Sequence, residues 1–145
     1  MARYTGPKWK ISRRENYDVF GDESWKKRPN PPGVQAVSKS RPSNYAVQFR
    51  EKQKVKRMYG LMEKQFKKIY IDATKATGNT GTIMLQLLET RLDNVVYKLK
   101  LAKTRNQARQ FVTHGHVLVN GAKLDIPSYK LSVGDEVSLT SKFQK

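Results

Sequence analysis

Apolar residues recur at helical spacing in two stretches of the chain. The first stretch carries Val55, Met58, Met62, Phe66, Ile69 and Ala73. Steps of three and four residues are typical of the buried face of an amphipathic helix. Because Gly60 interrupts this stretch, the pattern predicts either one bent helix or two consecutive helices. The second stretch predicts a buried helix and carries Met84, Leu88, Leu92, Val95 and Leu99, flanked by Leu85, Leu87 and Val96.

The segment TRNQARQFVTHGHVLVNGAKL, residues 104–124, predicts a helix followed by a β-hairpin. Thr104 and Gln107 have the spacing of a capping box, in which each side chain accepts a free backbone N–H at a helix start. Gly115 suits the left-handed position just past a helix end, and Asn120-Gly121 predicts a two-residue hairpin turn. The helix turns its apolar residues toward a core: Ala108, Phe111 and Val112. The predicted strands are residues 116–119, 122–124 and 136–140.

Residues 1–43 show no apolar period, and helices would be broken by Pro29, Pro31, Pro32, Gly33 and Pro42. Composition alone is compatible with a disordered tail. Large side chains argue against that interpretation: Tyr4, Trp9, Ile11, Tyr17, Phe20 and Trp25. We therefore expect a basic arm that is irregular by itself and ordered on a partner. The predicted fold class is α+β, with a basic extended arm (1–43), a helical region (44–83) and a module of helices packed on a small antiparallel sheet (84–145).

The chain contains 29 Lys and Arg against 12 Asp and Glu, a formal net charge of +17. Self-repulsion at that charge works against a compact state, which favours a polyanionic partner. Nucleic acid is the first candidate, because neutralising phosphates releases condensed counterions. An anionic membrane surface is the alternative, although no apolar run approaches the ~18–20 residues that span a bilayer. The absence of cysteine and of a signal peptide before the Met-Ala-Arg start favours a cytoplasmic protein.

Two groups of basic residues are candidate phosphate contacts. The first lies on the predicted helix after residue 43 and consists of Arg50, Lys52, Lys54, Lys56 and Arg57. Too few acidic residues flank this group to form pairs within the helix, so phosphate contact is favoured over a merely solvated face. Arg105 and Arg109 lie one turn apart on the later helix, on a different face from its apolar residues. We expect replacement of both with alanine to weaken RNA binding and to leave the fold intact.

The pattern does not support catalytic or metal-binding chemistry. His114 and His116 have no clustered third and fourth ligand for a metal ion. No nucleophile stands in a recognisable constellation with them either. We interpret them as residues of the corner between helix and strand, with stacking on RNA or hydrogen bonding to it as a further alternative. The loop Gly78-Asn79-Thr80-Gly81 lacks the Gly-Lys-Ser/Thr ending of a nucleotide-binding P-loop.

Three charged residues, Glu89, Arg91 and Asp93, interrupt the second apolar stretch. We expect Glu89 and Arg91 to face solvent or each other. The two carboxylates are one helical turn apart, and a solvated pair bridged by neighbouring cations is favoured over an acid–base site. The chain is therefore not expected to be an enzyme.

Several motifs resemble one family of ribosomal proteins. Residues 88–129 resemble the small RNA-binding S-four domain. The runs RYTGPK (3–8), FREKQKVKRMYG (49–60), GNTG (78–81) and LLETRLDNVVY (87–97) resemble the bacterial-type small-subunit ribosomal protein four family, in the family's order. The resemblance covers nearly the whole chain and is weakest across residues 16–43. The run Pro127-Ser128-Tyr129 also matches the family and is compatible with a structural or a functional role.

The resemblance implies a structural constituent of the small ribosomal subunit. It implies binding to a multi-helix junction in the 5′ domain of 16S-type rRNA, early in subunit assembly. It also implies a place beside ribosomal protein five, near the channel through which messenger RNA enters, in a bacterial-type or organelle ribosome, with a role in translational accuracy. The matching RNA-binding positions are Arg3, Tyr4, Lys8, Arg13, Arg14, Arg50, Lys52, Lys54, Lys56, Arg57, Arg91, Arg105, Arg109, His114, His116, Asn120 and Lys123.

Two departures from the family bear on these implications. Many members hold zinc through cysteines in the arm, where this chain has Trp9 and Ser12, so no zinc or other cofactor is expected. Members usually continue into a C-terminal segment that packs back on the helical part, whereas this sequence stops at Lys145. An RNA-modifying enzyme that carries the domain as an accessory is the alternative, but residues 1–83 are too short and too basic to form a catalytic domain.

Overall fold

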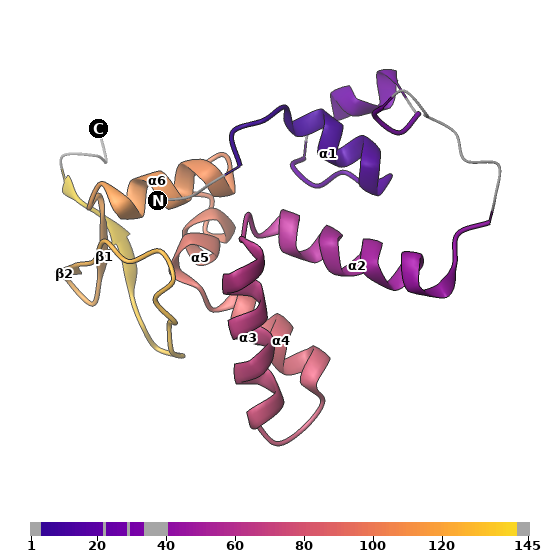
Figure 1. Cartoon of the computed structure of the whole chain (residues 1–145). Coiled ribbons are helices and arrows are strands. Elements are labelled where there is room, and N and C mark those ends of the chain that lie inside the picture. The colour runs from indigo at the N-terminus through magenta and orange to yellow at the C-terminus, as the bar shows by residue number, and fades with distance from the viewer. Residues whose placement is uncertain (1–3, 22, 29, 34–40, 142–145) are drawn as a thin grey trace. The chain divides into compact units, whose positions relative to one another are not determined.

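The computed structural model describes residues 4–21, 23–28, 30–33 and 41–141. The chain divides into two compact units, Met1–Glu63 and Lys64–Lys145. The elements are α1 (Lys8–Glu15), the 3-10 helix η1 (Glu23–Lys27), α2 (Asn44–Met58), α3 (Glu63–Lys75), α4 (Thr80–Glu89), α5 (Leu92–Lys98), α6 (Arg105–Thr113), β1 (Val117–Val119), β2 (Ala122–Lys123) and β3 (Val137–Leu139) (Figure 1). Helices combined with a three-stranded antiparallel sheet confirm the predicted α+β class.

Helix α1 lies in the arm that was expected to be irregular. It starts after Pro7 and ends at Asn16, whose φ of 47° places it in the left-handed region. Its buried residues are Ile11, Ser12 and Glu15. With a single apolar residue among them, the helix leaves no apolar period in the sequence, so the pattern did not reveal it.

The first apolar stretch forms two helices, which was one of the two predicted arrangements. Helix α2 ends at Met58, and Gly60 has a φ of 64°, a left-handed conformation that suits glycine. The turn shifts the apolar phase, so Leu61 is buried and the predicted core residue Met62 is exposed. In α3 the expected positions are buried: Phe66, Ile69 and Ala73.

The second apolar stretch was predicted to form one helix, and that prediction was wrong. Helix α4 ends at Glu89 and α5 begins at Leu92. Leu88 and Leu92 are fully buried, as expected from the apolar stretch. Beyond the break, Val96 is fully buried in place of the predicted Val95, and Leu99 is exposed.

The start of α5 is stabilised by backbone groups that come much later in the chain. The N–H of Leu92 donates to the carbonyl of Tyr129 at 2.9 Å, and the N–H of Asp93 donates to the carbonyl of Pro127 at 3.2 Å. These bonds satisfy donors that every helix start leaves free. The backbone of the Pro-Ser-Tyr run therefore has a structural role.

The core of the second unit lies between α5, α6 and the sheet (Figure 1). Strand β1 is central, in the order β2-β1-β3, and Val119 is opposite Ala122 on one side and Val137 on the other. Asn120 and Gly121 have φ values of 52° and 79°, as a two-residue turn with both residues left-handed requires. The core residues are Leu92, Val96, Ala102, Ala108, Val112, Val117 and Val119.

The start of α6 follows the predicted capping box with one difference. The Thr104 hydroxyl accepts the N–H of Gln107 at 3.2 Å, as expected. The Gln107 side chain accepts the N–H of Lys103 at 2.8 Å instead of that of Thr104. At the other end, Gly115 has a φ of 68° and provides the left-handed residue.

Candidate nucleic-acid interface

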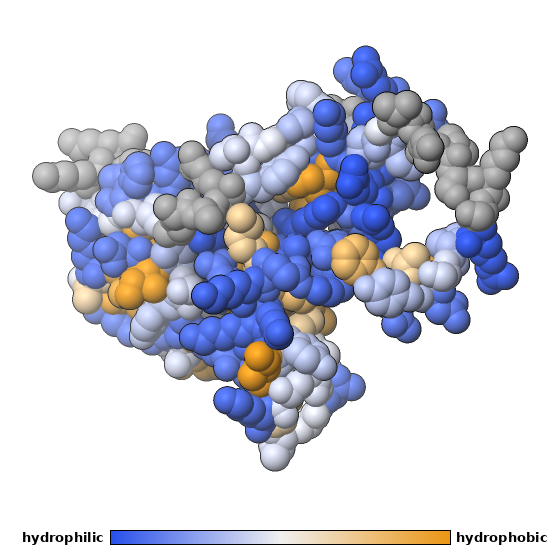
Figure 2. Space-filling model, viewed as in Figure 1, coloured by the Kyte–Doolittle hydropathy of each residue, from blue (hydrophilic) through white to orange (hydrophobic). Residues whose placement is uncertain are grey.

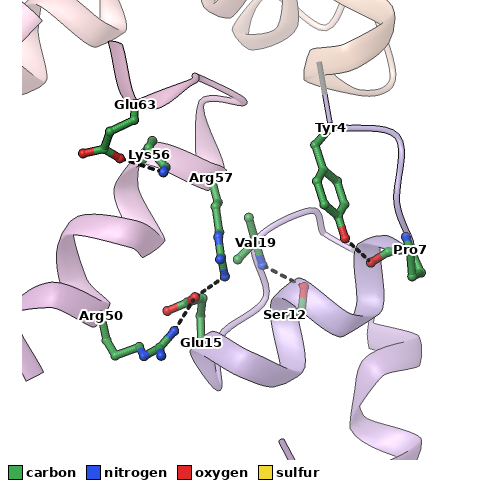
Figure 3. A network of polar contacts seen from close by, with 9 residues as sticks. All are labelled: Tyr4, Pro7, Ser12, Glu15, Val19, Arg50, Lys56, Arg57 and Glu63. Atoms are coloured by element: carbon green, nitrogen blue, oxygen red, sulfur yellow. Dashed lines mark hydrogen bonds and ion pairs between the residues drawn. The ribbon is translucent and has the colours of Figure 1, made fainter. Parts of the chain in front are cut away.

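Each of the five cationic side chains of α2 contacts a carboxylate within the first unit. Their partners are three glutamates: Glu15 of α1, Glu51 of α2 itself and Glu63 at the start of α3. Figure 3 shows Glu15 and Glu63 with three of these cations, Arg50, Lys56 and Arg57. Only the pair of Lys54 with Glu51 lies within the helix, so few intrahelical pairs form, as expected. The inference that the other cations are therefore unpaired was wrong, because their partners lie outside α2. Glu15 precedes the helix by many residues, and a count of neighbours along the sequence does not include it.

Glu15 binds two arginines of α2 (Figure 3). Its side chain is buried, and Oε1 contacts Arg57 and lies 3.5 Å from Nη1 of Arg50. Oε2 is buried without a hydrogen-bond partner among the described residues. A buried carboxylate is costly unless it is paired, so the two arginines compensate its charge and tie α1 to α2.

Glu63 forms ion pairs with two lysines of α2 that are one helical turn apart. Lys52 and Lys56 both contact its carboxylate, the latter at 2.8 Å. The hydrogen bond from Lys52, followed by that from Lys56, lowers the pKa of Glu63 from 4.5 to about 2. Because this carboxylate is half-exposed, solvent screens the pair and its contribution to stability is small.

The α2 cations differ in how much of each remains available to a partner. The side chains of Arg50 and Lys52 are 46% and 42% exposed. Those of Lys54, Lys56 and Arg57 are mostly buried. Arg50 and Lys52 are therefore the cations of α2 that are most accessible to RNA.

The arm residues that were predicted to bind RNA differ in how many contacts they make within the first unit. Arg14 is exposed and makes no polar contact with the described residues. Arg13 donates from Nε to the carbonyl of Asn30 at 2.8 Å. Lys8 lies 5.9 Å above the ring of Phe20, and the hydroxyl of Tyr4 donates to the carbonyl of Pro7 at 3.4 Å. Arg3 lies outside the described residues.

Arg91 was predicted to face solvent or Glu89, and the structure contradicts this expectation. Its burial also leaves little of the side chain exposed for the predicted contact with RNA. It is 6% exposed and donates from Nε and Nη2 to the two carboxylate oxygens of Asp93, at 3.1 and 2.8 Å. Arg109 of α6 lies 3.8 Å from the same carboxylate. Burial lowers the pKa of the Arg109 guanidinium, and the charge of Asp93 opposes that effect. Because α4 breaks before Arg91, this arginine starts α5 inside the unit.

Arg105 also packs against α5. Its Nε donates to Oδ1 of Asn94 at 3.0 Å, and its guanidinium lies 4.5 Å from the ring centroid of Tyr97. Asn94 in turn donates to the carboxylate of Glu89 at 2.8 Å. Both arginines of α6 thus contact residues of α5. That alanine at both positions leaves the fold intact stays a prediction.

His114 and His116 lie at the corner between α6 and β1, as predicted. Their ring centroids are 6.0 Å apart, and the His116 ring lies edge-on to Phe111 at 6.4 Å. His114 is exposed and His116 is half-buried. Across the described ranges, no three His, Cys, Asp or Glu residues cluster as a metal site would require. The role of the two rings in RNA contact stays a prediction.

In the hairpin, Asn120 is hydrogen-bonded to a neighbouring turn, whereas Lys123 is exposed and has no polar partner among the described residues. Asn120 donates from Nδ2 to Asp135 at 2.9 Å, and its Oδ1 accepts the N–H of Glu136 at 2.9 Å. These bonds hold two turns together, and the bond from Asn120 is the main cause of a lowered pKa of Asp135. Lys123 is exposed, and its alkyl chain crosses Gly115 so closely that a Cβ there would lie 2.0 Å from Cε.

The sequence analysis missed a row of lysines on α3. All four are exposed, and none forms an ion pair or hydrogen bond with the described residues. Two of them come three and four residues after the first, and the last comes seven residues after the third, which places all four along one side of the helix. This spacing is visible in the sequence, but helical periodicity was considered only for apolar residues. We call this row the α3 lysine face: Lys64, Lys67, Lys68 and Lys75.

Hydrophilic residues cover most of the face shown in Figure 2, and the hydrophobic areas on it are small and separate. Within the part of the chain that the structure describes, no helix combines the length and the apolarity needed to cross a membrane.

Comparisons with known proteins decide the family. The family description "Ribosomal protein S4/S9 N-terminal domain" matches residues 3–89, and "S4 domain" matches residues 90–137. The chain belongs to the uS4 family of small ribosomal subunit proteins. The uS4 assignment confirms the resemblance inferred from the sequence motifs. The two matches meet at the end of α4, whereas the predicted boundaries after residues 43 and 83 remain predictions.

Bacterial relatives named "Small ribosomal subunit protein uS4" align with nearly the whole chain. The relative from Cutibacterium acnes is 53% identical over 143 residues, which are 98% of this chain and 71% of that protein. Those from Phytoplasma mali and Shewanella violacea are 54% and 50% identical, and the alignments cover 72% and 73% of their lengths and 98% and 100% of this chain. These names are names of a ribosomal protein and not of an enzyme, in agreement with the prediction that the chain is not one.

Proposed function

We propose that this chain is a structural constituent of the small ribosomal subunit and binds its ribosomal RNA. The observation that carries the proposal is membership of the uS4 family along nearly the whole chain. The surplus of exposed positive charge supports it, because the α3 lysine face forms no ion pair or hydrogen bond with the described residues that would neutralise its charge.

The exposed cations supply the binding free energy in this proposal. Each phosphate that a lysine or arginine neutralises releases counterions, which makes the affinity fall steeply with salt. We assign phosphate contacts to the α3 lysine face, to Arg14, to Arg50 and Lys52, and to Lys123. We withdraw Arg91, because its guanidinium is bound inside the unit. Asn120, Arg105 and Arg109 position the elements that carry the surface.

The RNA site is proposed to be a multi-helix junction in the 5′ domain of 16S-type rRNA. RNA helices are read mainly through shape, backbone and 2′-hydroxyls, which suits a surface of lysines spread over several elements. Binding early in subunit assembly, contact with ribosomal protein five and with messenger RNA, a role in translational accuracy and a zinc-free arm are further parts of the proposal. The ribosome concerned is of bacterial type, in the cytoplasm or in an organelle.

The test is chemical footprinting of the 5′-domain RNA with the full chain at physiological salt. The proposal predicts that one junction is protected selectively, at chain concentrations that leave an unrelated RNA of the same length unprotected. Equal affinity for the unrelated RNA and for anionic vesicles would show a general polyanion binder instead and would overturn the proposal.

A further inference from the structure

Two aromatic rings lie exposed near the start of α2. Tyr45 and Phe49 are one helical turn apart, and their ring centroids are 6.1 Å apart with planes inclined by 20°. Tyr45 is 75% exposed and Phe49 is 37% exposed. A ring as open as that of Tyr45 contributes little to the core of the unit, so burial within the described structure does not account for it.

Two cations flank this aromatic pair. The guanidinium carbon of Arg50 lies 5.7 Å from the Phe49 ring centroid, and Nζ of Lys52 lies 6.0 Å from it. These are also the most exposed cations of α2. Arg50 forms an ion pair with Glu15, and Lys52 forms one with Glu63. These pairs restrict the two side chains, so a partner has less side-chain entropy to remove.

The chemistry of this surface fits a nucleobase better than an apolar protein segment. A base offers a flat π-face, and its neighbouring phosphates are negative, whereas an apolar segment leaves both cations without a partner. Proteins that bind single-stranded RNA combine aromatic side chains that stack on bases with cations that contact the backbone. Unpaired bases at junctions and bulges are free to stack in this way.

We propose that Tyr45 and Phe49 form a stacking platform for one unpaired RNA base, with Arg50 and Lys52 contacting the adjacent phosphates. The proposal rests on the proposed function in that the ligand is the small-subunit RNA. It adds the residues that recognise a base, a contact distinct from the phosphate contacts of the α3 lysine face.

The test compares Tyr45→Leu with Tyr45→Trp in binding to the 5′-domain RNA across a range of salt concentrations. Tyr45→Leu should weaken binding about 5-fold or more, as expected for the loss of one stacked base. The slope of log affinity against log salt should not change, because no phosphate contact is removed. Tyr45→Trp should keep the wild-type affinity, since the indole also stacks.

Tyr70→Leu is the matched control. Tyr70 of α3 is a helical tyrosine that is 51% exposed and has no cation over its ring within the described residues. Its replacement should leave the affinity unchanged. The melting temperature of each variant shows whether it is folded.

Ultraviolet cross-linking of the wild-type complex makes the test independent of folding. A nucleotide adduct should appear on Tyr45 or Phe49 and not on Tyr70. If Tyr45→Leu binds with wild-type affinity, or if an adduct appears on Tyr70 alone, the stacking platform is ruled out. Either result would leave the proposed binding to ribosomal RNA unaffected. A wild-type chain that does not distinguish the 5′-domain RNA from unrelated RNA would instead overturn the proposed function.

Discussion

Each of the two units contains one buried carboxylate bound by two arginines. In the first unit Glu15 meets Arg50 and Arg57, and in the second Asp93 meets Arg91 and Arg109. The two sites differ in how completely the carboxylate is satisfied. Both oxygens of Asp93 accept bonds from Arg91, whereas Oε2 of Glu15 has no partner among the described residues.

The arginines also differ in their access to solvent. Arg91 and Arg109 are largely buried, but Arg50 reaches the surface. The site in the second unit therefore serves the fold, and the site in the first unit serves both the fold and the surface. Among the described residues, the charge that remains unpaired lies on exposed residues such as Arg14 and, above all, on the α3 lysine face.

The largest effect is expected for Asp93→Ala. This change leaves the buried guanidinium of Arg91 without its carboxylate, and breaking a buried pair in this way costs ~3–5 kcal/mol. The free energy of unfolding from urea denaturation should fall by that amount. A loss below about 1 kcal/mol would mean that Arg91 finds water or another partner, and the Asp93 site would not be central to the fold.

A smaller effect is expected for Glu15→Ala. The side chains of Arg50 and Arg57 are 46% and 25% exposed, more than that of Arg91, so the two freed guanidinium groups can reach water. The loss should therefore be ~1–3 kcal/mol, the cost of leaving a partly buried group unsatisfied. The same urea titration measures it. If Glu15→Ala destabilised the chain as strongly as Asp93→Ala, the greater solvent access of the arginines around Glu15 would not reduce the cost of losing the carboxylate.

The smallest effect concerns pH and Glu63. Its pKa is lowered to about 2, so its stabilising contribution is present above pH 4.5 and is lost as the pH falls through about 2. The wild-type chain should lose more stability than Glu63→Gln between these pH values, by a small margin because the pair is exposed. Melting temperatures of the two chains over that range provide the comparison. Parallel pH profiles would mean that the lysine pairs do not form in solution.

The hairpin could be predicted from a few neighbouring residues. The break between α4 and α5 and the ion pairs of α2 with Glu15 were not predicted, because they involve residues distant in sequence. Asn120-Gly121 and Thr104 specify their own turn and cap through backbone geometry, so their positions could be predicted from a few neighbouring residues. The break before α5 depends on carbonyls in the segment 127–131, more than thirty residues later. The pairing of Arg57 depends on Glu15, 42 residues earlier.

The prediction of the interface was limited in a different way. Basic residues were chosen by local charge, and for arginines that criterion does not separate an interior pair from a surface contact. Arg91 was misassigned because its carboxylate partner, two residues away, is buried with it once the helix breaks. The α3 lysine face was missed although its helical spacing was visible in the sequence.

The central claim is that exposed lysines bind RNA while the buried arginine pairs hold the fold. Salt-dependent binding of the 5′-domain RNA by a variant with glutamine at all four positions of the α3 lysine face tests it most directly. The slope of log affinity against log salt should fall in magnitude by ~0.7–0.9 for each lost phosphate contact, with the free energy of unfolding unchanged. Arginine at the same four positions keeps the charge and should keep the wild-type slope. A glutamine variant that retains the wild-type slope and affinity would contradict the claim.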